Sequence, residues 1–410
     1  MILQKTDNLL NYVPTIIQKI LGFIRDILIV SVIGIGVASD DFFLWLITSI
    51  IPISLVGNGI RIKVQKHILG GSTHLGAHFF IVTAVSLIIL PVWLTTFSYF
   101  FNIPTALTET SNLIYISIYF MLIFYQRFFQ GIIQGLKLYK TSLSLPSFGI
   151  VLFIILLVTF RESEFLYIAI CLAAFLEVVT LLFIIKSKGI FLLKRSENID
   201  FIDYNITLVF LSVSALLPSL YPAISQSLIH TLKDGQLTVF LLAIKIPTTI
   251  ATLIISVLTM TIFNESFISK NKHQYLANRL SVYFFITSAA SLLVFFLSTY
   301  IVDVYSFFIE FNNNIAIEII EYLKVLSFII PFQVCSIIVW RFIAANIDER
   351  KIYLFSNAAG AVQILTFFLL FSYTSLDLAY VALFAFMANF LAYIINYHIF
   401  IKKILSSSIN

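Results

Sequence analysis

Charged side chains interrupt an apolar stretch that is long enough to cross a bilayer. The stretch covers residues 17–43 and contains Lys19, Arg25 and Asp26. A charge in the bilayer core costs roughly 3 kcal/mol or more unless it faces a partner or a water-filled cavity. On a helix, Lys19, Gly22 and Asp26 fall on one face, and Arg25 lies a fraction of a turn to the side. We therefore expect a membrane-spanning helix with a polar stripe that faces something other than lipid.

Apolar stretches of similar length recur along the whole chain. Of the 410 residues, 60% are hydrophobic and 11% are charged, whereas about 25% of the residues in a soluble domain are charged. The stretches do not alternate apolar with polar residues, as the strands of a membrane barrel do. The composition predicts an all-α polytopic membrane protein. Twelve spans are expected, at residues 12–34, 41–60, 78–101, 112–135, 142–160, 164–186, 204–232, 236–263, 280–304, 315–345, 352–373 and 377–401.

The basic residues are distributed unevenly among the loops between these spans. If both termini are cytoplasmic, most of the 25 Lys and Arg residues lie on that side, and the opposite loops hold only Arg161 and Lys233. This asymmetry follows the positive-inside rule, so we expect both termini in the cytoplasm. The longest polar loop, residues 186–204, separates an N-terminal lobe of six spans, residues 1–195, from a C-terminal lobe of six spans, residues 196–410.

Motifs for covalent chemistry are absent from the sequence. It contains no P-loop, no His-Glu-x-x-His, no Gly-x-Ser-x-Gly and no paired cysteine motif, and its two cysteines, Cys171 and Cys335, lie inside apolar runs. The basic residues are scattered over short loops, which argues against nucleic-acid binding. We expect no enzymatic activity, no cofactor and no bound metal, and the missing P-loop argues against transport driven by ATP within this chain.

Charges within the predicted spans carry the most information about function. Arg25 and Asp26 lie near the middle of the first span, and Lys245 lies within the eighth. These spans belong to different lobes. Cations from both lobes that face one cavity would form a site for a doubly charged anion.

Other charges in the spans have simpler explanations. Arg127 and Glu177, on the fourth and sixth spans, are as compatible with a structural ion pair as with a role in transport. Arg341 and Lys19 lie near cytoplasmic ends, where long side chains reach the interface at low cost. His230 is interpreted as a packing residue with a satisfied ring.

The first stretch also matches a known pattern. The residues Leu21-Gly22-Phe23, Arg25-Asp26, Gly34, Gly36, Asp40 and Phe42-Phe43 resemble the start of the MurJ/MviN lipid II flippases. These belong to the MOP superfamily, which also holds the Wzx polysaccharide-lipid flippases and the MATE exporters. The likeness continues through residues 135–148 and 225–267. It implies two six-helix bundles, which rock to give alternating access, in the inner membrane of a bacterium.

The resemblance also implies roles for individual residues. Arg25, Lys245 and Lys19 would bind a lipid pyrophosphate, since these flippases hold that group with cavity cations. Asp26 would keep Arg25 oriented or exchange partners with the substrate, and Asp40 is assigned to the same coupling or orienting group. The expected partners are an undecaprenyl-pyrophosphate glycolipid, the bilayer, and the polymerase and glycosyltransferases of a polysaccharide pathway. We expect the protein to be a monomer.

Departures from the family pattern bear on the substrate. Ile53 and Leu242 stand where the lipid II flippases carry arginines, and Lys245 lies one turn from the second of these positions. We therefore expect a flippase for an O-antigen or other surface polysaccharide repeat unit. The alternatives are a lipid II flippase for peptidoglycan and a MATE-like, cation-coupled exporter of small molecules. A membrane scaffold without transport would leave the buried cations unexplained.

Overall fold

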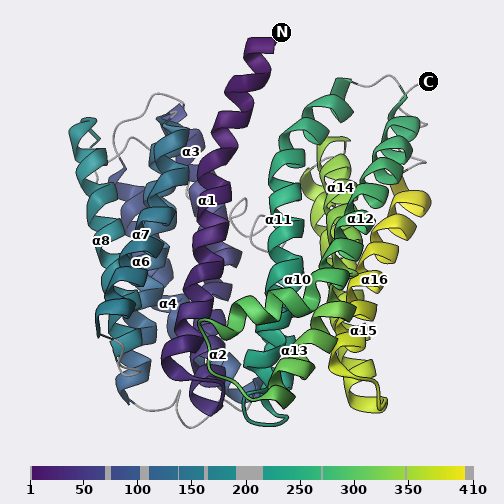
Figure 1. Cartoon of the computed structure of the whole chain (residues 1–410). Coiled ribbons are helices and arrows are strands. Elements are labelled where there is room, and N and C mark those ends of the chain that lie inside the picture. The colour runs from purple at the N-terminus through teal and green to yellow at the C-terminus, as the bar shows by residue number, and fades with distance from the viewer. Residues whose placement is uncertain are drawn as a thin grey trace. The chain divides into compact units, whose positions relative to one another are not determined.

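The structure, a computed structural model, describes residues 2–69, 75–101, 110–136, 138–160, 165–190, 216–268, 271–346 and 349–401 (Figure 1). Within these ranges all regular secondary structure is helical. Two compact units are present, one comprising residues 1–33, 37–215 and 226–231, and the other residues 34–36, 216–225 and 232–410. The predicted lobe boundary, between residues 195 and 196, lies outside the described residues.

The helices follow the apolar stretches of the sequence. The N-terminal part of the chain forms α1 (Ile2–Ile33), α2 (Val37–Pro52), a short π-helix η1 (Ile53–Gly57), α3 (Asn58–Leu69), α4 (Gly76–Phe101), α6 (Thr110–Gly135), α7 (Tyr139–Phe160) and α8 (Phe165–Ser187). The C-terminal part forms α10 (Leu216–His230), α11 (Gln236–Ile268), α12 (Lys272–Ser306), α13 (Asn313–Leu326), α14 (Ile329–Asn346), α15 (Glu349–Tyr373), α16 (Leu378–Asn396) and the π-helix η2 (Tyr397–Ile401).

Each predicted span falls on one of these helices or on consecutive ones. The seventh predicted span begins in residues 204–215, which lie outside the described residues. Within the described chain, seven helical segments are long and apolar enough to cross a membrane, and two further apolar helices are shorter. The predicted fold class, an all-α polytopic membrane protein, is confirmed.

Helix α6 holds the first unit together. It packs against α3 and α8, while α7 packs against α1 and α8. Phe120, Phe124 and Phe128 recur every four residues on α6 and are fully buried in one apolar cluster, because side chains four residues apart share a helix face. This packing fixes the position of the polar side chains that α6 carries between its phenylalanines.

Two glycines let α3 approach α6 closely. A Cβ atom on Gly131 would lie 2.6 Å from the backbone oxygen of Arg61, and one on Gly135 would lie 2.6 Å from Cβ of Ile68. Small residues at this four-residue spacing allow membrane helices to pack backbone against backbone. Arg127 lies one turn before Gly131 on the same face of α6, so the contact brings Arg61 close to Arg127.

In the second unit, α14 is the helix with the most neighbours. It packs against α11, α12 and α16, and α15 packs against α16. The start of α10 is fixed against α15, since the backbone N–H of Leu217 donates to Oδ1 of Asn357 at 3.0 Å. A Cβ atom on Gly360 would lie 2.7 Å from the backbone nitrogen of Pro218, which shows how closely these two helices approach.

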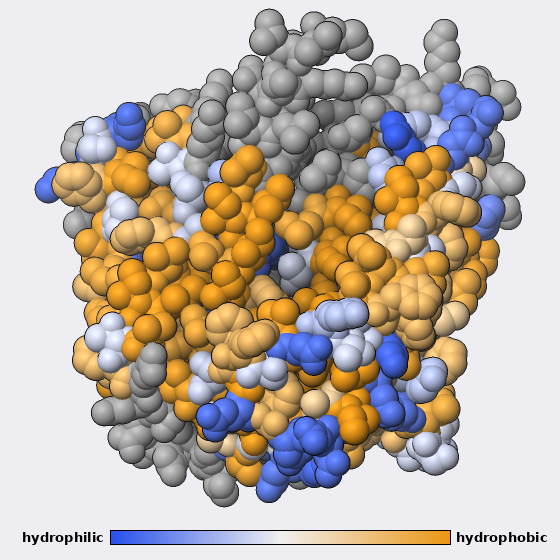
Figure 2. All heavy atoms as spheres, in the orientation of Figure 1, coloured by the Kyte–Doolittle hydropathy of each residue, from blue (hydrophilic) through white to orange (hydrophobic). Residues whose placement is uncertain are grey.

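Large apolar side chains cover much of the outer surface. Phe183, Phe285 and Phe296 are 73–81% exposed, and Figure 2 shows apolar side chains over much of the described surface, with hydrophilic ones mainly toward its ends. Exposed apolar surface of this extent needs lipid to cover it. The chain is therefore a multi-pass membrane protein.

Candidate functional site: a charged cavity in the first unit

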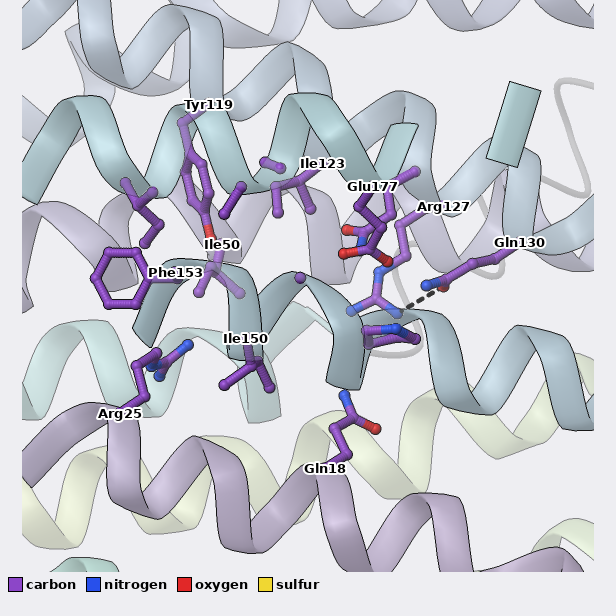
Figure 3. Close-up of a pocket in the computed structure, with 16 residues that line it drawn as sticks. Gln18, Arg25, Ile50, Tyr119, Ile123, Arg127, Gln130, Ile150, Phe153 and Glu177 are labelled. Atoms are coloured by element: carbon purple, nitrogen blue, oxygen red, sulfur yellow. Dashed lines mark hydrogen bonds between the residues drawn. The ribbon is translucent and has the colours of Figure 1, made fainter. Parts of the chain in front are cut away.

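A cavity of about 260 Å³ lies among the helices of the first unit. Its walls come from α1, α2, α6, α7 and α8, and Figure 3 shows its charged and amide side chains among apolar ones. The lining residues are Gln18, Arg25, Ile50, Tyr119, Ile123, Gln126, Arg127, Gln130, Pro146, Gly149, Ile150, Phe153, Ile170, Ala173, Ala174 and Glu177. Two arginines and a glutamate inside an apolar helix bundle make this the strongest candidate site in the described chain.

Arg25 enters the cavity from α1 and is held by its neighbour in sequence. Its Nε donates to Oδ1 of Asp26 at 2.7 Å, and a terminal nitrogen lies 2.6 Å from the same oxygen. The Arg25 side chain is 22% exposed, and that of Asp26 is 12% exposed. Because guanidinium has five N–H donors, the contact with Asp26 leaves donors of Arg25 for another group.

Arg127 and Glu177 lie on facing helices, α6 and α8, at another part of the cavity (Figure 3). A terminal nitrogen of Arg127 donates to Oε1 of Gln130 at 3.3 Å, and Gln126 hydrogen-bonds to the Glu177 carboxylate. The Nε atom of Arg127 and the Oε1 atom of Glu177 are buried without a hydrogen-bond partner among the described residues. Among these residues, Arg25 forms an ion pair with Asp26, His230 lies in hydrogen-bond contact with Asp41, and Arg127 and Glu177 do not form an ion pair.

Helix geometry separates the two polar regions of the cavity. Tyr119 lies near Arg25 and interacts with it electrostatically. Eight residues separate Tyr119 from Arg127 on α6, which corresponds to about 12 Å along the helix axis. On α1, Gln18 and Arg25 are seven residues apart, so they face the same way about 10 Å from each other. The cavity is therefore elongated, with Arg25 at one end and Arg127 with Glu177 at the other.

A third arginine stands behind the Arg127 end. Arg61 on α3 is close enough to Arg127 for the two positive charges to interact, and its Nε atom is likewise buried without a partner in the described chain. The tight contact at Gly131 holds the Arg61 backbone there. The Arg127 end thus carries two guanidinium groups and one carboxylate.

The structure brings some of the predicted site residues together at the cavity and leaves others outside it. Arg25, Arg127 and Glu177 line the cavity, and Asp26 pairs with Arg25. Lys19 and Asp40 are not among the described lining residues, although Asp40 is buried in the first turn of α2.

Lys245 and Arg341 belong to the second unit. Arg341 lies over the ring of Trp340, with its guanidinium carbon 4.6 Å from the ring centroid. The proposed roles of Lys19, Lys245, Asp40 and Arg341 stay predictions.

The two positions that depart from the lipid II family are buried among apolar groups. Ile53 is fully buried in the same cluster as the phenylalanines of α6. Leu242 is 4% exposed, and its backbone oxygen accepts a hydrogen bond from Tyr305 at 3.2 Å. Neither position contributes a polar group to the cavity.

Three uncharged polar residues of the cavity were not among the predicted site residues. Gln18, Gln126 and Gln130 line the cavity, and their signal was available in the sequence. Gln18 lies seven residues before Arg25, and Gln126 and Gln130 lie on either side of Arg127, in otherwise apolar helices. The pair of His230 with Asp41, at 2.8 Å, was also missed, although His230 was correctly interpreted as a satisfied residue.

A metal site is not evident, since no three His, Cys, Asp or Glu side chains gather closely enough in the described part of the chain. The sequence matches no protein-family model and no curated protein. Solved structures do match. A lipid II flippase MurJ in an inward closed conformation aligns with a TM-score of 0.77 and 16% identity, covering 95% of this chain and 87% of that one.

An inward-facing multidrug resistance MATE family transporter of the MOP superfamily aligns with a TM-score of 0.70 and 16% identity over 93% of each chain. A MATE structure in complex with MaD3S aligns with a TM-score of 0.67 and 13% identity, covering 97% of this chain and 95% of that one. This chain has the MOP superfamily fold. The resemblance that the first span predicted is thereby confirmed at the level of the fold, and the MOP fold is spanned almost from end to end.

Proposed function

We propose that this protein is a flippase that moves an undecaprenyl-pyrophosphate-linked oligosaccharide from the inner to the outer leaflet of a bacterial inner membrane. The glycan would be an O-antigen or other surface polysaccharide repeat unit. The observation that carries the proposal is Arg25, a cation on a membrane helix that lines a cavity and still has donors to offer. The MOP fold, shared with a flippase and with exporters, supports transport by alternating access.

The chemistry required of the site is binding, without a covalent step. Arg25 would hold phosphate oxygens with the planar pairs of N–H donors that suit them. Asp26 would orient the guanidinium through the contacts at 2.6–2.7 Å. Lys19 and Lys245 are the further cations that we assign to the pyrophosphate, and Asp40 joins Asp26 in the orienting or coupling group.

Lipid II is the nearest alternative substrate, because it has the same pyrophosphate anchor. Each charge-assisted hydrogen bond contributes about 1.5–3 kcal/mol. Ile53 and Leu242, which stand where the lipid II flippases carry arginines, cannot form such bonds. A MATE-like exporter is the second alternative, and the buried Glu177 carboxylate is the observation that favours it. The two arginines that line the cavity, Arg25 and Arg127, favour an anionic substrate instead.

A replacement experiment tests the proposal. In a strain that lacks its repeat-unit flippase but makes a compatible glycan, the protein should restore surface polysaccharide, and Arg25→Gln should abolish the restoration. Arg25→Lys should retain part of it, since charge survives while the paired donors are lost. The matched control is Arg279→Gln, at a half-buried arginine on α12 that stacks on Tyr275, and it should restore fully.

The same strains separate the alternatives. The protein should fail to sustain growth when it replaces an essential lipid II flippase. Growth in that setting would make lipid II the better answer, and full restoration by a well-expressed Arg25→Gln variant would contradict the anion-binding role.

A further inference from the structure

The end of the cavity that holds Arg127 has hydrogen-bonding capacity of two opposite kinds. Arg127 and Glu177 both line this end of the cavity, so a guanidinium that donates hydrogen bonds lies beside a carboxylate that accepts them. The Nε atom of Arg127 and the Oε1 atom of Glu177 are themselves enclosed by protein without a partner among the described residues. Buried polar atoms in membrane proteins are expensive unless something satisfies them. A ligand that contacts both residues has to accept a hydrogen bond from Arg127 and donate one to Glu177.

This requirement selects the chemistry of the ligand. A phosphate or carboxylate would suit Arg127 but would be repelled by Glu177, and a cation would suit Glu177 but would be repelled by Arg127. A hydroxyl group both donates and accepts. A ring with neighbouring hydroxyls can therefore bind both residues at once, and the amides of Gln18, Gln126 and Gln130 add further donors and acceptors in the same cavity.

We infer that the Arg127–Glu177 end of the cavity is a subsite for a neutral, hydroxyl-rich sugar ring, the one attached nearest to the pyrophosphate. The inference rests on the proposed function, since it takes the anion at Arg25 to be that of a glycolipid. Water molecules occupy such polar sites when no ligand is bound, and the sugar hydroxyls replace them.

Size and spacing agree with this assignment. At about 260 Å³, the cavity is smaller than the roughly 300–1,000 Å³ of most sites for whole small molecules. It has room for one ring but not for an oligosaccharide. The two ends are about 12 Å apart along α6, so one pyrophosphate cannot contact both arginines in the same way, whereas an anchor phosphate and its first sugar follow one another along the cavity.

Gly149 on α7, which has no side chain, leaves the space that Glu177 occupies. A Cβ atom on Gly149 would lie 2.6 Å from Oε2 of Glu177. Glycine at this position lets the carboxylate pack against the backbone of α7. Gly149 is therefore a positioning residue for the subsite.

Binding measurements on the purified full-length protein test the inference. The probes are undecaprenyl pyrophosphate without a sugar, and the same lipid carrying one glucose, galactose or N-acetylglucosamine. At least one glycosylated probe should bind ten-fold or more tightly than the bare anchor. A site that hydrogen-bonds the hydroxyls of one ligand binds a ligand without them much more weakly. Arg127→Gln and Glu177→Gln should each reduce this preference to less than three-fold, and Arg25→Gln should weaken all four probes to a similar extent.

A second variant covers the case in which a change at Arg127 prevents folding. Gly149→Ala keeps every charge and displaces only the Glu177 carboxylate, so it should reduce the sugar preference as well. Equal binding of all four probes to the wild type, or a preference that survives both glutamine variants, would overturn the sugar subsite while Arg25-dependent binding of the bare anchor upholds the proposed function. Failure of every probe to bind would overturn the proposed function itself.

Discussion

Three buried carboxylates of the first unit lie next to polar partners. Asp26 pairs with Arg25, Asp41 with His230, and Glu177 accepts from Gln126. Each partner offsets part of the cost of keeping a charge out of water. Asp26 and Arg25 are neighbours in sequence, whereas His230 comes 189 residues after Asp41.

That difference decides what the sequence could predict about the site. Arg25 and Asp26 stand out as charges in the middle of an apolar span, and their pairing needs no tertiary information. Joining Arg127 and Glu177 in one cavity with Gln18 requires knowledge of how α1, α6 and α8 pack, which periodicity alone does not contain. The glutamines were not predicted as site residues because burying an uncharged amide in a span costs less free energy than burying a charge.

A double-mutant cycle measures the contact between His230 and Asp41. Asp41→Asn and His230→Gln should each destabilise the protein, because each leaves a largely buried polar group without its partner at 2.8 Å. The two changes together should cost less than their sum, with a coupling energy of about 1–3 kcal/mol in denaturant unfolding in detergent micelles.

The control pair for this cycle is Asp303→Asn with Arg279→Gln. These residues are 24 positions apart on α12, or about 36 Å along the helix, and their coupling should be close to zero. A coupling close to zero for Asp41 and His230 as well would mean that their contact does not stabilise the fold.

At the level of helices, the predicted spans identified the elements but not their interruptions. The second predicted span is α2, η1 and α3 in succession, and the tenth is α13 followed by α14. The break in the tenth lies at Ser327 and Phe328, where the Ser327 hydroxyl donates to the oxygen of Lys324 at 2.7 Å. A serine in an apolar run does not by itself announce such a break, since serine also continues membrane helices.

Three glycines on helices of the first unit form a graded series. A new Cβ would meet the Arg61 backbone at Gly131, the mobile end of the Glu177 side chain at Gly149, and nothing within 4 Å at Gly22. Gly131→Ala should destabilise the protein by about 1–3 kcal/mol, because a backbone atom cannot move aside. Gly149→Ala and Gly22→Ala should stay within about 1 kcal/mol of the wild type.

Thermal melting of the three variants in one detergent gives the ranking. Gly131→Ala should melt lowest, and the other two should melt near the wild type. If Gly131→Ala melts with Gly22→Ala, then the close approach of α3 to α6 is not needed for the stability of the unit.

For the whole molecule, composition predicted most of the architecture. A chain that is 60% hydrophobic has to satisfy its backbone within helices once it enters a bilayer, so the number and order of spans follow from the apolar runs. The resemblance in the first span extended this to the MOP fold, which the solved structures confirm. The side of the membrane on which each loop lies stays a prediction, because it depends on charge at the loops rather than on packing.

Two exposed lysines allow that orientation to be measured. Lys188, just after α8, lies in a loop predicted to be cytoplasmic, and Lys233, between α10 and α11, lies in a loop predicted to face outward. The chain has two cysteines, Cys171 and Cys335, so a background with Cys171→Ala and Cys335→Ala contains no thiol that can react with maleimides.

In that background, Lys233→Cys should be labelled by a membrane-impermeant maleimide in intact cells. Lys188→Cys should be labelled only after the membrane is permeabilised, because the positive-inside rule predicts that the basic loop after α8 lies on the cytoplasmic side. Surface polysaccharide restoration by each variant provides the control that the protein is inserted correctly. The reverse labelling pattern would invert the predicted orientation, and with it the direction of the transport that we propose.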